Sequence, residues 1–269
     1  MTSKPAPKTV RYEVGSVRKA LSILCLFSPA QPALNVTDVS RTLGVSKSAV
    51  HNLLRTLQNM DFLSQDAVSK HYRLGRKVFE LGTLYSHGND LVTCALPHLL
   101  KLREKTNETV KLGVLANTEA MVVKALESPL TLHTRGDEGR FAPLYCTGIG
   151  KALLSLLPKD DMLDVLARVG LRPFTPRTVT SLSKLVEQVE QARRQGYAVD
   201  CNENEDGVNC VGAPVGIVGH ERVAISVSGP TTRFGNRRIP ELAALVVGAA
   251  RAIAASLTTP ATDEKSGQK

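Results

Sequence analysis

Tryptophan is absent from this 269-residue chain, and aromatic residues make up only 4% of it. Hydrophobic residues still amount to 42%, so aliphatic side chains must build the core. No apolar run approaches the ~20 residues of a membrane span, and the start of the chain lacks the apolar stretch of a secretory signal. We therefore expect a soluble cytoplasmic protein, with residues 1–12 as a disordered basic arm and residues 260–269 as a disordered tail.

Cysteines are few, odd in number and far apart. The five of them lie at positions 25, 94, 146, 201 and 210, and no two form a C-x-x-C pair. This spacing argues against a disulfide framework and against a structural zinc site. We predict reduced thiols, no metal and no cofactor.

Acidic residues are scarce in the first third of the chain. Residues 1–79 contain 12 Lys and Arg but only 4 Asp and Glu, whereas the other 190 residues contain 22 and 21. Nearly all of the net charge of +9 therefore lies in the first third. A basic small domain joined to a neutral large one predicts that the first part binds a polyanion. A solubilising tail is the alternative, but most of these basic residues fall within segments that have the pattern of helices or strands.

Three helical patterns follow one another between residues 16 and 60. The first, over residues 16–28, places its apolar residues on one face: Val17, Ala20, Leu21, Leu24 and Phe27. The second is expected to begin at Thr37, an N-cap residue type, and to end at Gly44, a C-cap type. Ser46 can cap the third, which reaches about residue 60. Two short helices joined by a glycine-containing turn are typical of a helix-turn-helix.

The third helix has one apolar and one polar side. Its apolar residues follow the i, i+3, i+4, i+7 pattern of a core-facing stripe: Val50, Leu53, Leu54 and Leu57. The opposite side carries groups suited to base edges and phosphates: Ser46, Lys47, Ser48, His51, Asn52 and Arg55. A merely solvated face would mix Glu with Lys, yet no acid occurs from Ser46 to Met60. This side is therefore predicted to contact DNA.

Two short extended segments, residues 62–64 and 71–74, predict a β-hairpin, or wing. Lys70, His71 and Arg73 are its candidate contacts with a phosphate backbone. Short hairpins occur in proteins of every kind, so these contacts are hypotheses. The region from 13 to 75 is predicted to be a winged helix-turn-helix domain.

Strands and helices alternate in the remaining chain. A linker helix over 76–86 is expected to break near Gly88-Asn89, and a second helix covers 90–105. Strands are expected at 109–115, 120–126, 197–201, 210–215 and 223–228, with a turn at Asn117-Thr118. Helices are expected at 150–157, 159–169, 181–195 and 239–257. Patterning alone makes this an α+β domain.

The segment from Gly148 to Lys151 reads Gly-Ile-Gly-Lys, but it is not a P-loop. That motif needs Gly and Ser or Thr where this chain has Tyr145 and Ala152. A glycine-rich entry into a helix can receive an anion such as a carboxylate, or it can be a tight turn that needs glycine. Further on, Ser226 and Ser228 alternate along a strand and so share one face. Their hydroxyls suit a polar ligand, although local hydrogen bonding or exposure to solvent is the commoner role of serine.

Several blocks of sequence, in this order, resemble the IclR family of bacterial transcriptional regulators. They begin with residues 16–24 (SVRKALSIL) and 44–57 (GVSKSAVHNLLRTL), followed by 72–75 (YRLG) and 79–82 (FELG). Further along come 147–154 (TGIGKALL), 210–215 (CVGAPV) and 224–230 (AISVSGP). The family often has Thr and Arg where this chain has Ala49 and Asn52, so an operator cannot be borrowed from a relative. It commonly has Ala in place of Gly212, a change expected to enlarge the pocket slightly.

The resemblance implies an N-terminal winged helix-turn-helix, a linker helix (76–89) and a GAF/PAS-like α/β effector-binding domain (90–259). It places the effector pocket at the start of the Gly148 helix and at Asp200 and Cys210. Together with the two serines of the strand, the predicted pocket consists of Gly148, Ile149, Asp200, Cys210, Ser226 and Ser228. Backbone N–H groups and hydroxyls are expected to bind a small organic acid there. Asp200 would repel a carboxylate unless it faces a hydroxyl. The resemblance also implies a dimer contact in the linker and the wing domain.

These features predict a sequence-specific DNA-binding regulator, more often a repressor than an activator in families of this kind. A homodimer, or a dimer of dimers, would place two recognition helices ~34 Å apart on a pseudo-palindromic operator. An architectural protein without a ligand would not explain the large neutral domain. We predict no enzymatic activity, because the chain has no G-x-S-x-G and no H-E-x-x-H. The open alternative is an enzyme centred on Cys210 and fused to a DNA-binding domain, which needs a histidine base near that thiol.

Overall fold

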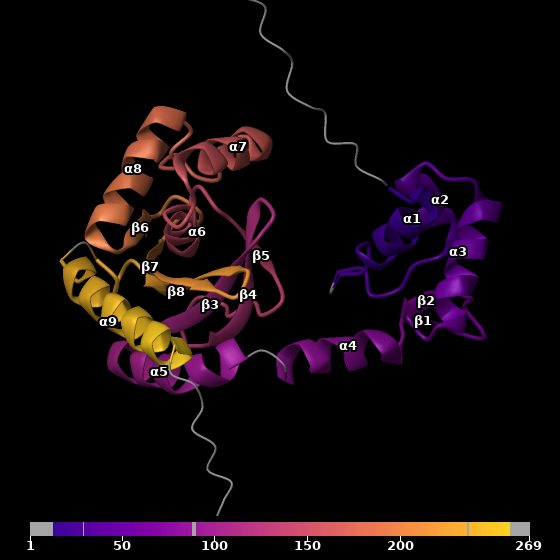
Figure 1. Cartoon of the computed structure of the whole chain (residues 1–269), viewed down its shortest axis with the longest axis horizontal. Coiled ribbons are helices and arrows are strands. Elements are labelled where there is room, and N and C mark those ends of the chain that lie inside the picture. The colour runs from indigo at the N-terminus through magenta and orange to yellow at the C-terminus, as the bar shows by residue number, and fades with distance from the viewer. Residues whose placement is uncertain (1–12, 29, 88–89, 236, 259–269) are drawn as a thin grey trace, which may run out of the picture. The chain divides into compact units, whose positions relative to one another are not determined.

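The computed structural model describes residues 13–28, 30–87, 90–235 and 237–258, and the chain divides into two compact units, Met1–Gly88 and Asn89–Lys269 (Figure 1). The expected arm over 1–12, the tail over 260–269 and the helix break at 88–89 lie outside the described residues. Each unit has its own hydrophobic core, so each is described by itself.

The first unit is a winged helix-turn-helix, as predicted. Its elements are α1 (Gly15–Leu24), α2 (Val36–Leu43), α3 (Lys47–Asn59), β1 (Leu63–Gln65), β2 (Tyr72–Leu74) and α4 (Arg76–His87). The two strands pair antiparallel, with Ser64 opposite Arg73. The core contains the following buried residues: Ile23, Leu34, Val39, Val50, Leu54, Leu57, Leu63 and Tyr72.

The caps of α2 and α3 follow ordinary capping chemistry, with one correction to the sequence analysis. Asn35, not Thr37, caps α2, because its extended backbone lets its side chain accept a hydrogen bond from the Asp38 N–H at 2.9 Å. Gly44 ends α2 in the left-handed conformation, with φ of 62°. Ser46 caps α3 and accepts a hydrogen bond from the Ala49 N–H.

The expected apolar face of α1 is wrong in part. The helix ends at Leu24, four residues earlier than predicted, and its only buried residue is Ile23. Val17 and Leu21 are 55% and 56% exposed. The two exposed residues share one side of the helix, so that side faces solvent more than the core of this unit.

The second unit is built on a six-stranded antiparallel sheet with strand order β5-β4-β3-β8-β7-β6. The strands are β3 (Thr109–Ala116), β4 (Glu119–Leu126), β5 (Phe141–Pro143), β6 (Ala198–Cys201), β7 (Val208–Val218) and β8 (Glu221–Pro230). The helices are α5 (Asp90–Thr106), α6 (Gly148–Leu154), α7 (Lys159–Val169), α8 (Leu182–Gln195) and α9 (Ile239–Thr258). The predicted turn lies at Asn117, with φ of 55°. Strand β5 was not predicted, because three residues ending in proline carry no alternation.

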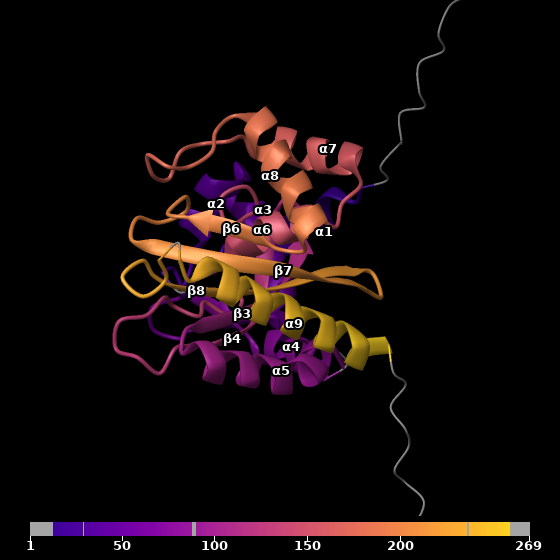
Figure 2. The same ribbon diagram turned by 90° about the vertical axis from the view of Figure 1, so that its left-hand side faces the viewer.

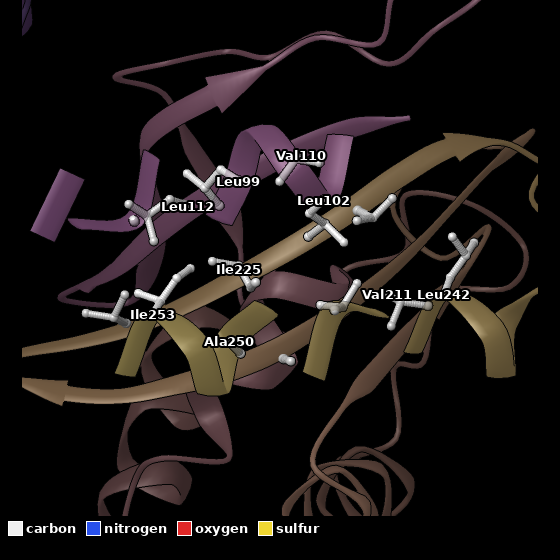
Figure 3. Packing of buried hydrophobic residues seen from close by; sticks show 14 of the residues in the cluster. Leu99, Leu102, Val110, Leu112, Val211, Ile225, Leu242, Ala250 and Ile253 are labelled. Carbon is white, nitrogen blue, oxygen red and sulfur yellow. The ribbon is translucent and has the colours of Figure 1, made fainter. Parts of the chain in front are cut away.

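Helices cover both faces of this sheet. Figures 1 and 2 show α5 and α9 side by side on one face and α6, α7 and α8 over the other. Figure 3 shows the packing on the face covered by α5 and α9. There Leu99 of α5 and Ala250 of α9 approach Leu112 and Ile225 of the strands. A separate cluster on the other face joins α6, α7 and α8 through Leu153, Leu166 and Val189.

Among the described helices, α9 alone has the length and hydropathy of a membrane span, with a mean hydropathy of 1.5. Its buried residues Leu242, Val246, Ala250 and Ile253 recur at helical spacing and belong to the core against the sheet. Packing in that core accounts for the buried part of the helix, which is 28% of the apolar window.

Candidate DNA-contacting surface and ligand cavity

The outer side of α3 is the candidate DNA-contacting surface. Val50, Leu54 and Leu57 are buried, and Leu53 is half-buried. The six residues predicted for the opposite side are all exposed: Ser46, Lys47, Ser48, His51, Asn52 and Arg55. The structure therefore brings the six together on one accessible, acid-free side of the helix.

The predicted residues of the wing differ in their exposure to solvent. Lys70 and Arg73 are exposed, whereas His71 is half-buried and its Nδ1 lies 3.0 Å from the Ser69 carbonyl oxygen. The tip is organised by Asp66, which the sequence analysis did not single out. Its Oδ1 accepts hydrogen bonds from the N–H of Ser69 at 2.7 Å and of Val68 at 3.1 Å. The Ser69 bonds are the main reason that the pKa of Asp66 is lowered.

In the second unit, strand register gathers the predicted pocket residues on one face of the sheet. Residues directly opposite in antiparallel strands share a face. Asp200 lies opposite Cys210 and Cys210 opposite Ser228, while Lys111 lies opposite Ser226. Ile225 and Val227 point the other way, into the core beneath α5 and α9. The predicted alternation of β8 is confirmed.

This face is the floor of a cavity of about 680 Å³. Five of the six residues predicted for the pocket line it: Ile149, Asp200, Cys210, Ser226 and Ser228. They come from α6, β6, β7 and β8, so only folding brings them together.

Gly148 does not line the cavity, which corrects its predicted place. A Cβ on this residue would lie 2.8 Å from the Cys210 Sγ, and its N–H donates to that sulfur. Gly212 corrects a second expectation. A Cβ there would lie 2.3 Å from the Gly148 carbonyl oxygen. The missing side chain of Gly212 therefore lets α6 approach β7 and does not enlarge the pocket.

The cavity has many polar lining residues that the sequence analysis missed. They are Lys111, His133, Thr134, Arg135, Asp137, Arg140, Thr147, Asn204, Glu205, Asp206, Thr231 and Thr232. Most lie in loops, which have no periodicity to mark them. Lys111 is the exception, because it is the one charged residue of the apolar strand β3 and could have been found there.

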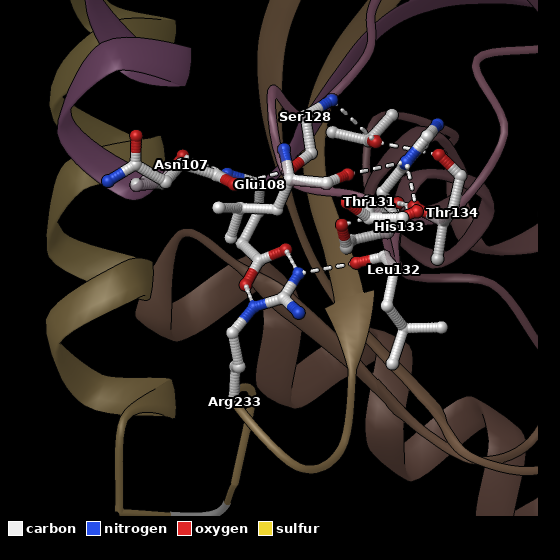
Figure 4. Close-up of polar contacts among 12 residues, drawn as sticks. Asn107, Glu108, Ser128, Thr131, Leu132, His133, Thr134 and Arg233 are labelled. Atoms are coloured by element: carbon white, nitrogen blue, oxygen red, sulfur yellow. Dashed lines mark hydrogen bonds and ion pairs between the residues drawn. The ribbon is translucent and has the colours of Figure 1, made fainter.

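Arg233, which is paired with the buried carboxylate of Glu108, connects two of the lining loops (Figure 4). Arg233 donates to both oxygens of this carboxylate at 2.9 Å and also donates to the Leu132 carbonyl oxygen at 2.8 Å. The Thr134 and Ser228 hydroxyls are 2.7 Å apart. The loop after β4 and the loop after β8 are thus held beside the cavity by a bidentate, charge-assisted pair.

Asp200 and two further charged groups are buried beside the cavity. The Asp200 Oδ1 accepts a hydrogen bond from the Glu203 N–H at 2.7 Å. Lys151 forms an ion pair with Glu203 and donates to the Val199 carbonyl oxygen at 3.0 Å. Burial raises the pKa of Asp200 to about 7 and also raises the pKa of Glu203. The Glu203 Oε2 is buried and has no hydrogen-bond partner among the described residues.

The cysteines of this unit do not resemble a catalytic centre. Burial raises the pKa values of Cys146 and Cys210 to about 12. Their thiols are therefore neutral at pH 7, and a neutral thiol is a poor nucleophile. Within the described ranges, no group of three or more His, Cys, Asp or Glu could hold a metal ion.

Comparison with known proteins identifies both units. The family model of the IclR helix-turn-helix domain matches residues 16–67, and that of the bacterial transcriptional regulator IclR C-terminal domain matches residues 83–255. The chain belongs to the IclR family of bacterial transcriptional regulators. The resemblance found in the sequence is thereby confirmed. IclR-family chains are regulators with a DNA-binding helix-turn-helix domain and a C-terminal effector domain, so this chain is not an enzyme.

Curated IclR-type relatives align along almost their whole length. The HTH-type transcriptional regulator XynR of Escherichia coli K12 is 34% identical over 251 residues, covering 92% of this chain and 99% of XynR. The HTH-type transcriptional repressor AllR of the same strain is 32% identical over 243 residues, covering 90% of each chain. A crystal structure of an IclR homolog from Microbacterium hydrocarbonoxydans, complexed with 4-hydroxybenzoate, shares the fold. It has a TM-score of 0.78 and 22% identity over 90% of this chain and 99% of that one.

Proposed function

We propose that this IclR-family regulator binds a pseudo-palindromic operator through α3 and the wing, and that a small organic acid in the cavity changes its operator affinity. Repression is the proposed mode, since the relative AllR is named a repressor. The cytoplasm is the proposed location, because that is where the DNA of a bacterium lies.

The observation that carries the ligand half of this proposal is the charge and polarity of the cavity. Lys111 lies on the floor opposite Ser226. The lining loops carry both cations, Arg135 and Arg140, and carboxylates, Asp137, Glu205 and Asp206, so Lys111 is the cation of the floor itself. Cations and hydroxyls within one cavity of about 680 Å³ suit the carboxylate and polar substituents of an organic acid. The complex of an IclR homolog with 4-hydroxybenzoate supports an acid of this kind.

The start of α6 contributes less to ligand binding than the sequence analysis expected. The Gly148 N–H faces Cys210, and the Gly150 N–H donates to the Thr147 hydroxyl at 3.0 Å. Of these first three N–H groups, that of Ile149 is the candidate donor to a ligand. Lys111 and the two serines therefore take over the role proposed for backbone N–H groups.

A dimer, or a dimer of dimers, is proposed for the DNA-bound form. Exposed apolar side chains on α1 and α4 support a contact between copies in the first unit: Val17, Leu21, Phe79 and Leu84. The effector is then expected to favour one spacing of the two α3 helices. A coupling of ~1–3 kcal/mol between ligand and operator is typical of such regulators.

The test is thermal unfolding of the full chain with 4-hydroxybenzoate, succinate and gluconate, which represent aromatic, dicarboxylic and polyhydroxylated acids. An acid present at a hundred times its Kd stabilises the folded state by ~2.7 kcal/mol. Lys111→Gln is expected to abolish the shift, and Lys184→Gln, at an exposed position of α8, is the matched control. Silence with all three acids would contradict the proposed ligand class, and a shift retained by Lys111→Gln would contradict the proposed role of Lys111.

DNA binding is tested with fragments that the full chain selects from a random duplex library. Selection of one palindromic sequence, followed by loss of binding when a stabilising acid is added, is the expected result. A library with no enriched sequence would contradict operator-specific binding.

A further inference from the structure

Two buried carboxylates share a single buried cation at the inner end of the cavity. Asp200, Glu203 and Lys151 are 3%, 5% and 1% exposed. Lys151 is committed to Glu203 and to the Val199 carbonyl oxygen. Asp200 forms no ion pair among the described residues, and of the two carboxylates it alone lines the cavity.

Asp200 is surrounded by groups of both signs, which come from every element packed around it. On the inner side these are Lys151 of α6, Cys146 before α6, Cys201 of β6, Glu203 after β6 and Cys210 of β7. On the cavity side they are Lys111 of β3, the loop residues His133, Arg135, Asp137 and Arg140, and Glu205 and Asp206. Its direct hydrogen bonds come from the backbone N–H groups of Glu203 and Asn204.

We propose that the cavity binds its acid effector together with one proton, which Asp200 holds on its carboxyl group and donates in a hydrogen bond to the ligand. The proposal rests on the proposed function, since it takes an organic acid as the occupant. The proton comes from solvent, and no covalent bond is made or broken.

The charge count of the buried groups carries this argument. The Lys151–Glu203 pair is neutral as a unit. An ionised Asp200 would then confront an entering carboxylate inside a cavity, where like charges repel more strongly than in water. A protonated Asp200 removes that repulsion and turns an acceptor into a donor. The remaining cation of the floor, Lys111, then balances the charge of the ligand.

The effect of burial on Asp200 points in the same direction. Burial raises the pKa of Asp200 to about 7, so near neutral pH the carboxyl group is already partly protonated. A bound anion raises the pKa further, because it disfavours a second negative charge beside it. Ligand binding is therefore expected to take up protons at pH 7 and above.

The experiment is isothermal titration calorimetry of the full chain with whichever of 4-hydroxybenzoate, succinate or gluconate stabilises it. Titrations at pH 6 and pH 8, in two buffers of different ionisation enthalpy at each pH, count the protons bound. The expected uptake at pH 8 approaches one proton per ligand. The Kd is expected to be about tenfold weaker at pH 8 than at pH 6, because the protonated fraction of a group with a pKa of about 7 falls by that factor.

Asp200→Asn is the decisive variant, because an amide has the shape of the protonated carboxyl group and keeps an N–H donor at every pH. It is expected to abolish the proton uptake and to bind the acid at pH 8 at least as tightly as the unmodified chain. His220→Gln, at an exposed histidine between β7 and β8 that does not line the cavity, is the matched control, since histidine also gains charge as the pH falls toward 6. It is expected to retain both the proton uptake and the pH dependence.

The outcomes separate this inference from the proposed function. Tight binding without proton uptake, or proton uptake retained by Asp200→Asn, overturns the inference and leaves the organic acid in place. A folded Asp200→Asn that no longer binds the acid also overturns it, because Asp200 would then act as a charged acceptor. Failure of all three acids to bind at either pH overturns the proposed function and the inference with it. The proton count on the unmodified chain tests the inference even if the variant does not fold.

Discussion

The two candidate sites of this regulator are built in opposite ways. The proposed DNA-contacting side of α3 consists of six exposed residues within ten positions of sequence, and its groups remain in water. The cavity collects residues from Lys111 to Thr232, and the carboxyl group of Asp200 in its lining is buried, as are Lys151 and Glu203 beside it. A surface site of the first kind costs the fold little. A cavity of the second kind places charges in the interior, where each one needs a partner or a proton. We therefore expect substitutions at the first site to affect DNA affinity and substitutions at the second to affect stability.

The largest effect is expected at the carboxylate of Glu108. Arg233→Met removes the bidentate partner and leaves a fully buried charge whose one remaining cation among the described residues is Arg238, 3.6 Å away. Breaking a buried pair in this way costs about 3–5 kcal/mol. Chemical denaturation monitored by circular dichroism measures the loss. Arg237→Met, at an exposed position four residues further on, should change the stability little, and an equal loss there would show that the pair is not the cause.

The second effect depends on pH. Asp200 binds its proton more tightly in the folded chain, with a pKa of about 7, than in the unfolded chain, where the pKa is near 3.8. Its contribution to stability is therefore complete below pH 4 and is lost as the pH rises to 7. Relative to the unmodified chain, Asp200→Asn should gain up to about 4 kcal/mol between pH 4 and pH 8. Urea denaturation at both pH values checks this expectation. A difference that does not vary with pH would mean that Asp200 is ionised in the fold.

The third effect tests how closely α6 packs on β7. Gly212→Ala places a methyl group 2.3 Å from the Gly148 carbonyl oxygen, so the start of α6 must move. Overpacking of this kind costs about 1–3 kcal/mol. Thermal unfolding measures the change, with Gly248→Ala as control, because a Cβ there meets nothing within 4 Å. An unchanged stability would show that α6 shifts without cost.

The smallest effect on stability and the clearest on function are expected at α3. Arg55→Ala should weaken binding to the selected operator about tenfold and reduce the salt dependence by one phosphate contact, with unfolding unchanged. Fluorescence anisotropy at several salt concentrations measures both quantities. Arg194→Ala, at an exposed arginine of α8, is the control. Equal weakening by the two variants would mean that only net charge matters and that the two sites do not divide their roles as described.

The sequence predicts features made by neighbouring residues, such as the side of α3, better than features made by distant segments, such as the cavity. The side of α3, the Ser46 cap and the alternation of Ser226 and Ser228 depend on periodicity or on neighbours in the chain, and all three are as predicted. The prediction of the buried side of α1 was wrong in part. Val17, Leu21 and Ile23 are all apolar, and spacing alone does not say which of them packs against the rest of the core. The loops that complete the cavity were missed, since no repeat marks Arg135, Arg140 or Thr231.

The sequence by itself therefore determined the class of protein, the order of its elements apart from β5, and the acid-free side of α3. These properties are local, because helical spacing, capping and charge act over a few residues. Only the tertiary structure decided which groups share the cavity. Lys151 meets Glu203 across 52 positions and Glu108 meets Arg233 across 125. Contacts at such separations are made by the register of the sheet and the packing of α6 on it. The protonation of Asp200 depends on the burial that results, which no local pattern in the sequence records.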